Sequence, residues 1–459
     1  MLQPVPFPVI APLVRRHAED AAFYWSQHDG SAYSPRLTLA GLARFSHLLA
    51  AHLEGLEVAG PEGWTLALTA LERWKQAGET FVCAYLALMT GIETQFDALL
   101  GQVRTSPEEL LRGVISALAW APPAQTLRVV HAWSGENNDP ILQTAALRAA
   151  ALIGSDALRA LSQPLIQFLN SPIEHVRSAA CRAATIDLSD DALDAKLAAC
   201  LHDPALPVRA EAAIALGRRQ HRQAKVDSDT NIIAAETLWL CVVEQVNLHN
   251  ASTGWYRKQS LRRLNRWVQH LAGLIPIGHP KLATLLDFMP ARVALRFIVY
   301  HGDPAHLPYV VAQMHEPGNA RYAGWVWQTM TGIDLRSTGM YAPEPESEDD
   351  TAALSEARLD ADLGLPLPNV DAISRYPSTA LTSGQPYLLG QRLTPALALT
   401  VLDDAVQAQR SIAAHYLNAL RPSANAAGPA RLFTRAVAHS QIRLALQIRE
   451  QLVAQEENI

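Results

Sequence analysis

Three segments in the middle of the chain repeat one pattern, and this repetition restricts the folds available to it. The copies start at residues 142, 176 and 208, which are offsets of 34 and 32 residues, and they align without gaps. Each copy follows a turn signal: Asp139-Pro140, Ser171-Pro172 and Asp203-Pro204. A repeat period of about 20 to 50 residues indicates stacked supersecondary units. We therefore expect units made of a helix, a turn and a second helix.

Alanine dominates the three copies, which favours close packing between helices. Small residues three and four positions apart let neighbouring backbones approach closely. Apolar helices are also predicted before the second and third copies, at 160–169 and 192–201. One such helix pair cannot bury its apolar face alone and must stack on others. The sequence therefore predicts an all-α fold, an α-solenoid of stacked helical hairpins.

The copies resemble the HEAT-repeat superfamily, whose units end the inter-helix turn with Asp and open the second helix with Val-Arg. The copies match this pattern to different degrees: Asp203 with Val208-Arg209 in full, Val176-Arg177 with Ser171 in place of the Asp, and Leu142-Gln143 more weakly. The resemblance implies that Arg177, Asp203 and Arg209 form a structural ladder of bonds along the stack.

A second resemblance covers nearly the whole chain. It rests on short landmark segments at 16–25, 51–56, 78–81, 302–304, 320–324, 331–334, 387–392, 407–414 and 441–443. These are similar to landmarks of a HEAT-like protein family whose genes lie beside type VI secretion genes in proteobacteria. An aromatic pair expected near 370–375 is absent. The resemblance implies a role near a toxin-delivery machine and carries no catalytic residues.

The helical pattern changes along the chain and predicts four regions. Residues 341–350 are acidic, carry prolines and lack periodicity, as in a linker, whereas 394–420 and 429–457 are predicted as helices. We expect an N-terminal helical region at 1–93, a repeat solenoid at 94–335, an acidic linker at 336–383 and a C-terminal helical region at 384–459.

Composition restricts the partners and the compartment. The net charge of -6 and isoelectric point near 6.2 provide no overall basic field, so nucleic acid is not expected as a partner. The start of the chain lacks the pattern of a secretory signal, and the four scattered cysteines suggest buried, reduced thiols. No apolar run reaches the length of a membrane helix. We expect a cytoplasmic protein with no membrane partner.

No sequence motif for catalysis is present: neither a phosphate loop, nor a nucleophile elbow, nor a His-Glu-x-x-His helix. Iron-dependent HEAT-like hydroxylases have several His-Glu pairs, whereas this chain has one, at His315-Glu316. His301, Asp303 and His306 are residue types that ligate metals, but they surround a Gly-Asp-Pro turn, so we predict a structural role for them. We expect no enzymatic activity, no metal and no cofactor.

Two sets of basic residues are candidate partner-binding sites. On a helix covering 255–267, Lys258, Arg262 and Arg266 share one face, with Trp255 at its start, while Leu261, Leu264 and Trp267 lie nearer the buried side. A charged helix face of this kind is more often simply solvated. It can instead bind an acidic protein segment, nucleic-acid phosphate or a membrane surface, or dock the acidic residues 344–350 of the same chain. Arg148 and Arg182 form the second set, at equivalent positions of successive repeats.

These features predict a non-enzymatic protein-binding scaffold. The family resemblance implies a type VI secretion accessory, an adaptor or chaperone for an effector or spike component. One alternative is an immunity protein that neutralises a cognate toxin. Another is an enzyme of the HEAT-like lyase or metal-dependent kind.

Overall fold

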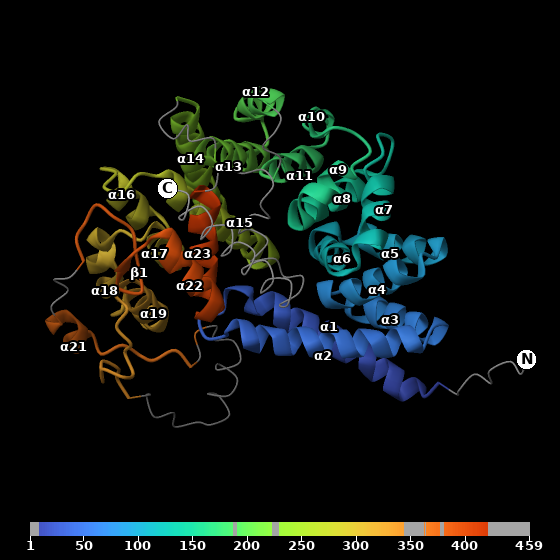
Figure 1. The fold of residues 1–459 in the computed structure, drawn as a ribbon, viewed down its shortest axis with the longest axis horizontal. Helices are drawn as coiled ribbons and strands as arrows, with labels where there is room; N and C mark the ends of the chain where they lie inside the picture. The colour runs from blue at the N-terminus through green and yellow to red at the C-terminus, as the bar shows by residue number, and fades with distance from the viewer. Residues whose placement is uncertain are drawn as a thin grey trace, which may run out of the picture. The chain divides into compact units, whose positions relative to one another are not determined.

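A computed structural model describes residues 9–186, 191–222, 229–343, 362, 364–376 and 381–420. The acidic residues 344–350 and the predicted helix 429–457 lie outside this part. The chain forms two compact units (Figure 1). Unit 1 contains the chain up to residue 224 with 402–414, and unit 2 contains 225–401 with 415–420. The boundary falls inside the range 94–335 that the sequence suggested as one solenoid.

Unit 1 is built from helices connected by short turns, and the prediction of an all-α fold is confirmed. Its helices are α1 (Ala11–Gly30), α2 (Leu39–Val58), α3 (Pro61–Trp74), α4 (Ala77–Thr90), α5 (Glu93–Thr105), α6 (Pro107–Trp120), α7 (Pro123–Trp133), α8 (Pro140–Ile153), α9 (Ser155–Arg159), α10 (Leu165–Phe168), α11 (Glu174–Ala184), α12 (Asp191–Cys200) and α13 (Leu206–Arg222), with a 3-10 turn η1 (Ser31–Tyr33).

The second helices of successive pairs form a continuous row. Helix α4 packs on α6, α6 on α8, α8 on α11 and α11 on α13 (Figure 1). Helices α3, α5, α7, α10 and α12 each pack against the member of the row that follows them in the chain. Unit 1 is therefore a stack of helical pairs, with α1 and α2 against its first pair.

Small residues on the row explain its close packing. The alanines of the three sequence repeats are almost fully buried: Ala145, Ala146, Ala149, Ala150, Ala179, Ala180, Ala183, Ala184, Ala210, Ala212, Ala213 and Ala215. On α6, a Cβ added at Gly113 would lie 2.3 Å from the Ala77 carbonyl oxygen and 2.7 Å from the Phe81 nitrogen of α4. The backbones touch, so larger side chains would separate the helices.

One predicted helix is wrong in unit 1. The sequence suggested a single helix at 160–169, but the structure has the short helices α9 and α10 with a turn between them. Pro164 precedes α10 and cannot donate a helical hydrogen bond. In the turn, the Ser162 backbone N–H donates to Ser134 Oγ at 2.8 Å and the Ser162 hydroxyl to the Ser134 carbonyl at 2.6 Å. These bonds replace the helical ones.

Unit 2 contains a second stack. Its helices are α14 (Asp229–Ala251), α15 (Gly254–Leu274), α16 (Leu282–Phe288), α17 (Ala291–His301), α18 (Leu307–Gln313), α19 (Ala320–Thr331) and α21 (Val370–Arg375), with a 3-10 turn η2 (Pro304–His306) and a hairpin of β1 (Tyr387–Leu388) and β2 (Gln391–Arg392). Here α15, α17 and α19 form the row, with α14, α16 and α18 beside them. Two more helices, α22 (Pro395–Asp404) and α23 (Gln407–Leu420), contribute residues to both units.

The hairpin loop closes the end of α19 in unit 2. The backbone N–H groups of Leu389 and Gly390 donate to the Thr329 and Met330 carbonyls at 2.7 and 3.0 Å. These carbonyls belong to the last turn of α19, which has no helical donors for them. Gly332 ends α19 at φ +74°, a left-handed conformation that glycine adopts without strain. A Cβ there would lie 2.4 Å from the Leu389 oxygen.

Part of the segment predicted as a linker packs onto unit 2. Asp362 is buried and accepts from Arg292 Nη2 of α17 at 2.8 Å, and the Leu365 carbonyl accepts from Arg321 Nη1 of α19 at 2.5 Å. Leu365 is also buried. The described residues of this segment are therefore attached to the helices of unit 2 through polar and apolar contacts.

Two expectations from the composition concern the cysteines and the apolar helices. All four cysteines are buried, as predicted, and none of them forms a disulfide. Among the described residues, no helix combines the length and the apolar character that crossing a bilayer requires.

Candidate functional site

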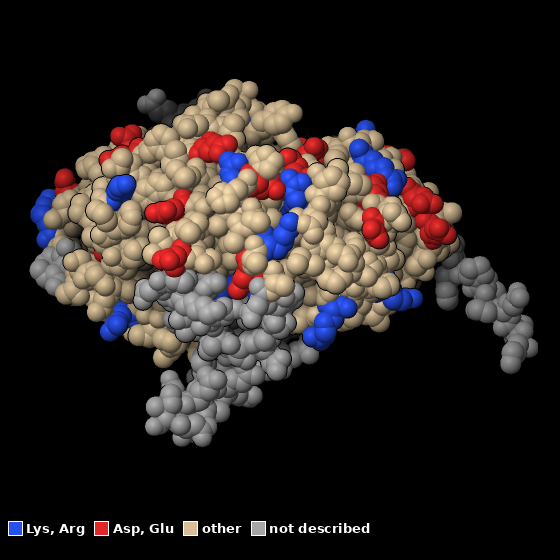
Figure 2. Space-filling model, turned by 90° about the horizontal axis from the view of Figure 1, so that it is seen from above, with Lys and Arg blue, Asp and Glu red and all other residues tan. Residues whose placement is uncertain are grey.

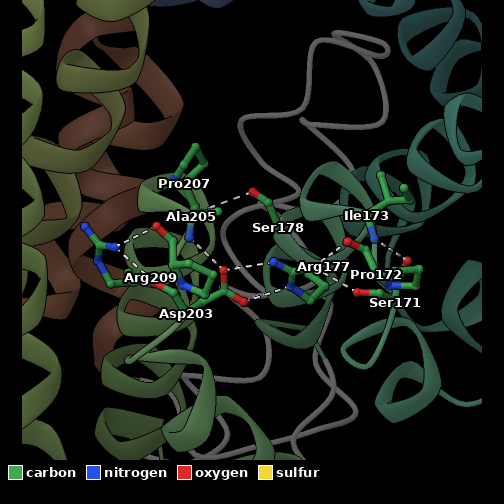
Figure 3. A network of polar contacts seen from close by, with 10 residues as sticks. Ser171, Pro172, Ile173, Arg177, Ser178, Asp203, Ala205, Pro207 and Arg209 are labelled. Atoms are coloured by element: carbon green, nitrogen blue, oxygen red, sulfur yellow. Dashed lines mark hydrogen bonds and ion pairs between the residues drawn. The ribbon is translucent and has the colours of Figure 1, made fainter.

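The turn before α13 carries the strongest polar contact between neighbouring helical pairs. Arg177, near the start of α11, donates from Nε and Nη2 to the two carboxylate oxygens of Asp203 at 2.8 and 2.9 Å (Figure 3). Both side chains are largely buried, with 14% and 9% exposed. Two parallel bonds from a planar guanidinium to a carboxylate fix geometry as well as charge. The Arg177–Asp203 ion pair therefore fixes the position of one helical pair relative to the next.

The same arginine also holds its own inter-helix turn. Arg177 Nη1 donates to the Ser171 and Pro172 carbonyls at 2.9 and 3.0 Å. Arg209 donates in the same way to the Asp203 and Pro204 carbonyls at 3.0 and 3.1 Å. Arg177 and Arg209 thus occupy equivalent structural positions, as their place in the repeat suggested.

The Asp203 carboxylate is stabilised as an anion. Burial raises its pKa, but hydrogen bonds from Arg177 and from the Ala205 backbone N–H outweigh burial and bring the pKa below its ordinary value. The hydrogen bond to Asp203 in turn raises the pKa of Arg177. Asp203 is therefore charged and satisfied inside the stack, which leaves it no capacity for an external ligand.

The two weaker repeats keep the turn, but the first has Gln143 in place of the arginine and the second has Ser171 in place of the aspartate. Asp139 Oδ1 and Ser171 Oγ accept from backbone N–H groups two residues ahead at 2.9 and 3.2 Å, as Asp203 does. Gln143, at the position of Arg177, donates to the Gly135 carbonyl at 2.8 Å. Arg104 from α5 donates to Asp139 at 2.9 Å. The turn is thus a common structural element with different cationic partners.

Arg182 is engaged inside the stack. The sequence suggested that it is available to a partner, but its Nη2 donates to Glu211 Oε1 on α13 at 2.6 Å. Glu211 is only 2% exposed, so this bond compensates a buried charge. Arg148, the equivalent residue on α8, is half-buried between Leu147 and Ala149, which are fully buried. These arginines offer less surface than the sequence indicated.

Sequence reasoning missed the acidic partners of these arginines. Glu211 lies among alanines in the sequence of α13. A single acidic residue on a helix face of small residues is the signal that could have identified it. Asp194 on α12 binds Arg219, whose side chain is 0% exposed, with an Nε to Oδ1 distance of 2.5 Å. A fully buried arginine cannot be recognised from a chain in which arginine is usually a surface residue.

Helix α15 presents the most accessible basic surface of the candidates. Lys258 and Arg262 are exposed, Arg266 is half-buried, and Leu264 and Trp267 are buried, as the predicted helix face requires. Leu261 is half-buried. The Gln245 amide of α14 donates to the buried Ser260 hydroxyl at 2.6 Å, which helps to fix the helix pair.

Three neighbours extend this surface beyond the residues that the sequence singled out. Arg257 and Arg263 are exposed, and Tyr256 is 73% exposed with its ring edge-on to the half-buried Trp255 at 5.1 Å. We call Tyr256, Arg257, Lys258, Arg262 and Arg263 the basic face of α15. The acidic residues 344–350, one possible occupant, lie outside the described residues.

His301, Asp303 and His306 converge at the turn that connects α17 with α18. One ligand atom from each lies within 4.8 Å of the others. Burial lowers the pKa of His301 to about 4, with a smaller contribution from the neighbouring His306, and burial also lowers the pKa of His306. Both imidazoles are therefore neutral at pH 7, the form that can accept a proton or a metal.

One face of the molecule carries mixed charge. On the face drawn in Figure 2, basic and acidic residues are interspersed among uncharged ones. No protein-family model, curated protein or solved structure matches this chain.

Proposed function

We propose that the protein is a non-enzymatic scaffold that binds an acidic segment of another protein through the basic face of α15. The observation that carries this proposal is the exposure of four cations and a tyrosine on the first half of α15, a helix that the buried Leu264 and Trp267 anchor in unit 2. Aromatic and arginine side chains are enriched at protein interfaces, and a helix anchored in the core presents them on a backbone that is already ordered before binding, which lowers the ordering cost.

The partner that we propose is a type VI secretion effector or spike component, held in the cytoplasm by this protein as an adaptor or chaperone. The sequence resemblance to the HEAT-like family supports this choice, and the stacked helical pairs fit the fold that the resemblance implies. Neutralisation of a toxin by an immunity protein would use the same face with tighter binding.

Affinity capture with charge-reversed variants tests the proposal. We expect the tagged wild type to retain a secretion component from native cytosol and the Lys258→Glu/Arg262→Glu variant to lose it. Arg15→Glu/Arg44→Glu is the matched control, since both arginines are exposed on α1 and α2 and the charge change is the same. Equal capture by all three proteins would refute the role of α15. Capture of a toxin whose activity is then blocked would favour the immunity role.

A further inference from the structure

The turn at 301–306 places three metal-ligating side chains together in unit 2. His301 is the last residue of α17, Asp303 precedes η2, and His306 ends η2. The Tyr387 N–H of β1 donates to the Gly302 carbonyl at 2.9 Å, so the turn is held from outside as well. The three side chains thus come from a short, fixed backbone segment, which limits the reorganisation that a ligand would require.

The buried nitrogens of this cluster lack hydrogen-bond partners. His301 is 3% exposed, and neither its Nδ1 nor its Nε2 forms a hydrogen bond. The carbonyls of Ile275 and Pro276 approach its ring without good hydrogen-bond geometry. His306 Nε2 is likewise buried and unpartnered. Buried polar atoms are normally satisfied, so unpartnered nitrogens on two neighbouring rings indicate a ligand.

The charge of Asp303 leads to the same conclusion. Asp303 is 1% exposed, and its Oδ1 accepts from the Ala305 N–H at 3.0 Å, the same cap that Asp203 forms. Asp203 is neutralised by Arg177, whereas Asp303 has no ion pair within the described part of the chain. A buried carboxylate without a cation is costly. At this turn two imidazoles stand where the other turn has a guanidinium.

We propose that His301, Asp303 and His306 bind one divalent transition-metal cation, with zinc as the best fit. Imidazole nitrogen and carboxylate oxygen are ordinary zinc ligands, and zinc bonds of about 2.0–2.2 Å in a tetrahedral site place ligand atoms roughly 3.4 Å apart. The cluster, now spanning up to 4.8 Å, would contract slightly on binding. Magnesium and calcium prefer all-oxygen sites and are not expected to bind.

The test is zinc binding to the full chain after metal removal with a chelator. We expect one zinc per chain by elemental analysis after dialysis, and competition with a chromophoric chelator to give the affinity. Asp303→Asn keeps an oxygen acceptor for the Ala305 cap and removes the charge, and His306→Gln alters a side chain at the edge of the core. Each change is expected to weaken binding by at least about 10–100-fold, the loss typical even for residues that only support a metal ligand.

Controls separate this site from adventitious histidine binding. His17 and His52 form a second histidine pair, with Nδ1 atoms 3.0 Å apart on α1 and α2. His17→Gln/His52→Gln should leave the stoichiometry and affinity unchanged. X-ray absorption of the zinc complex should show two imidazole ligands. Absence of zinc binding by the wild type, or equal affinity in the Asp303→Asn and His306→Gln variants, would overturn the proposal.

Discussion

Two Asp-Pro turns, one in each unit, solve the burial of a carboxylate in different ways. At Asp203 a two-point bond from Arg177 supplies the positive charge and also connects consecutive helical pairs. At Asp303 the backbone cap is the same, but the neighbours are His301 and His306. The first turn is complete without any ligand, whereas the second has acceptors and no cation among the described residues. The same Asp-Pro turn therefore serves as an internal connection in unit 1 and, in our proposal, as a binding site in unit 2.

Removal of the arginine from the first turn should have the largest effect. Arg177→Ala leaves Asp203 buried without its partner, and loss of one member of a buried pair costs about 3–5 kcal/mol. Urea unfolding should show this loss, with a smaller loss in Arg177→Ala/Asp203→Asn. Arg159→Ala is the control, because its pair with Asp156 is 73% and 67% exposed and such pairs contribute at most about 1 kcal/mol. Equal effects of Arg177→Ala and Arg159→Ala would contradict the comparison.

Acid should destabilise the second turn first. The pKa of His301 is lowered from 6.5 to about 4, by burial and then by His306, so the unfolded chain binds a proton in this window that the folded chain does not. In metal-free protein, stability is therefore complete above pH 6.5 and falls as the pH drops towards 4, by at most about 3 kcal/mol for this residue.

The first turn should respond only at lower pH. The pKa of Asp203 lies below the ordinary 3.8, so its contribution to stability is complete above that value and is lost as the pH falls through the lowered pKa.

Urea unfolding at pH 7 and pH 5 tests the prediction for His301. The wild type should lose stability between these two pH values, and His301→Gln should lose less. Hydrogen exchange over residues 291–313 should place the loss in unit 2. The same loss in both proteins would argue against burial of a neutral His301.

The glycine of the second turn should show a smaller effect. Gly302 has φ +75°, and an added Cβ would lie 3.1 Å from both Pro386 Cβ and the Tyr387 nitrogen. Gly278 has φ +77° and nothing within 4 Å of such a Cβ. Gly278→Ala should cost about 1 kcal/mol for the left-handed backbone alone. We expect Gly302→Ala to cost more, as measured by thermal unfolding, and equal costs would show that the strand β1 does not constrain the turn.

The sequence predicts the fold better than the contacts within it. Repetition and alanine content predict stacked helices, and the structure contains them. The break at Pro164 was missed because the apolar pattern continues through it. The roles of Arg182 and His301 depend on which side chains tertiary packing brings beside them, and the spacing of residues along one helix carries no information on this.

Site-specific photo-crosslinking from position 256, in the first turn of α15, tests directly whether the basic face of α15 binds a partner. Mass spectrometry of the product identifies that partner. We expect a crosslink to an acidic segment of a secretion component, and we expect the Lys258→Glu/Arg262→Glu variant to lose this crosslink. A partner that crosslinks from an exposed position on α2 and not from 256 would contradict it.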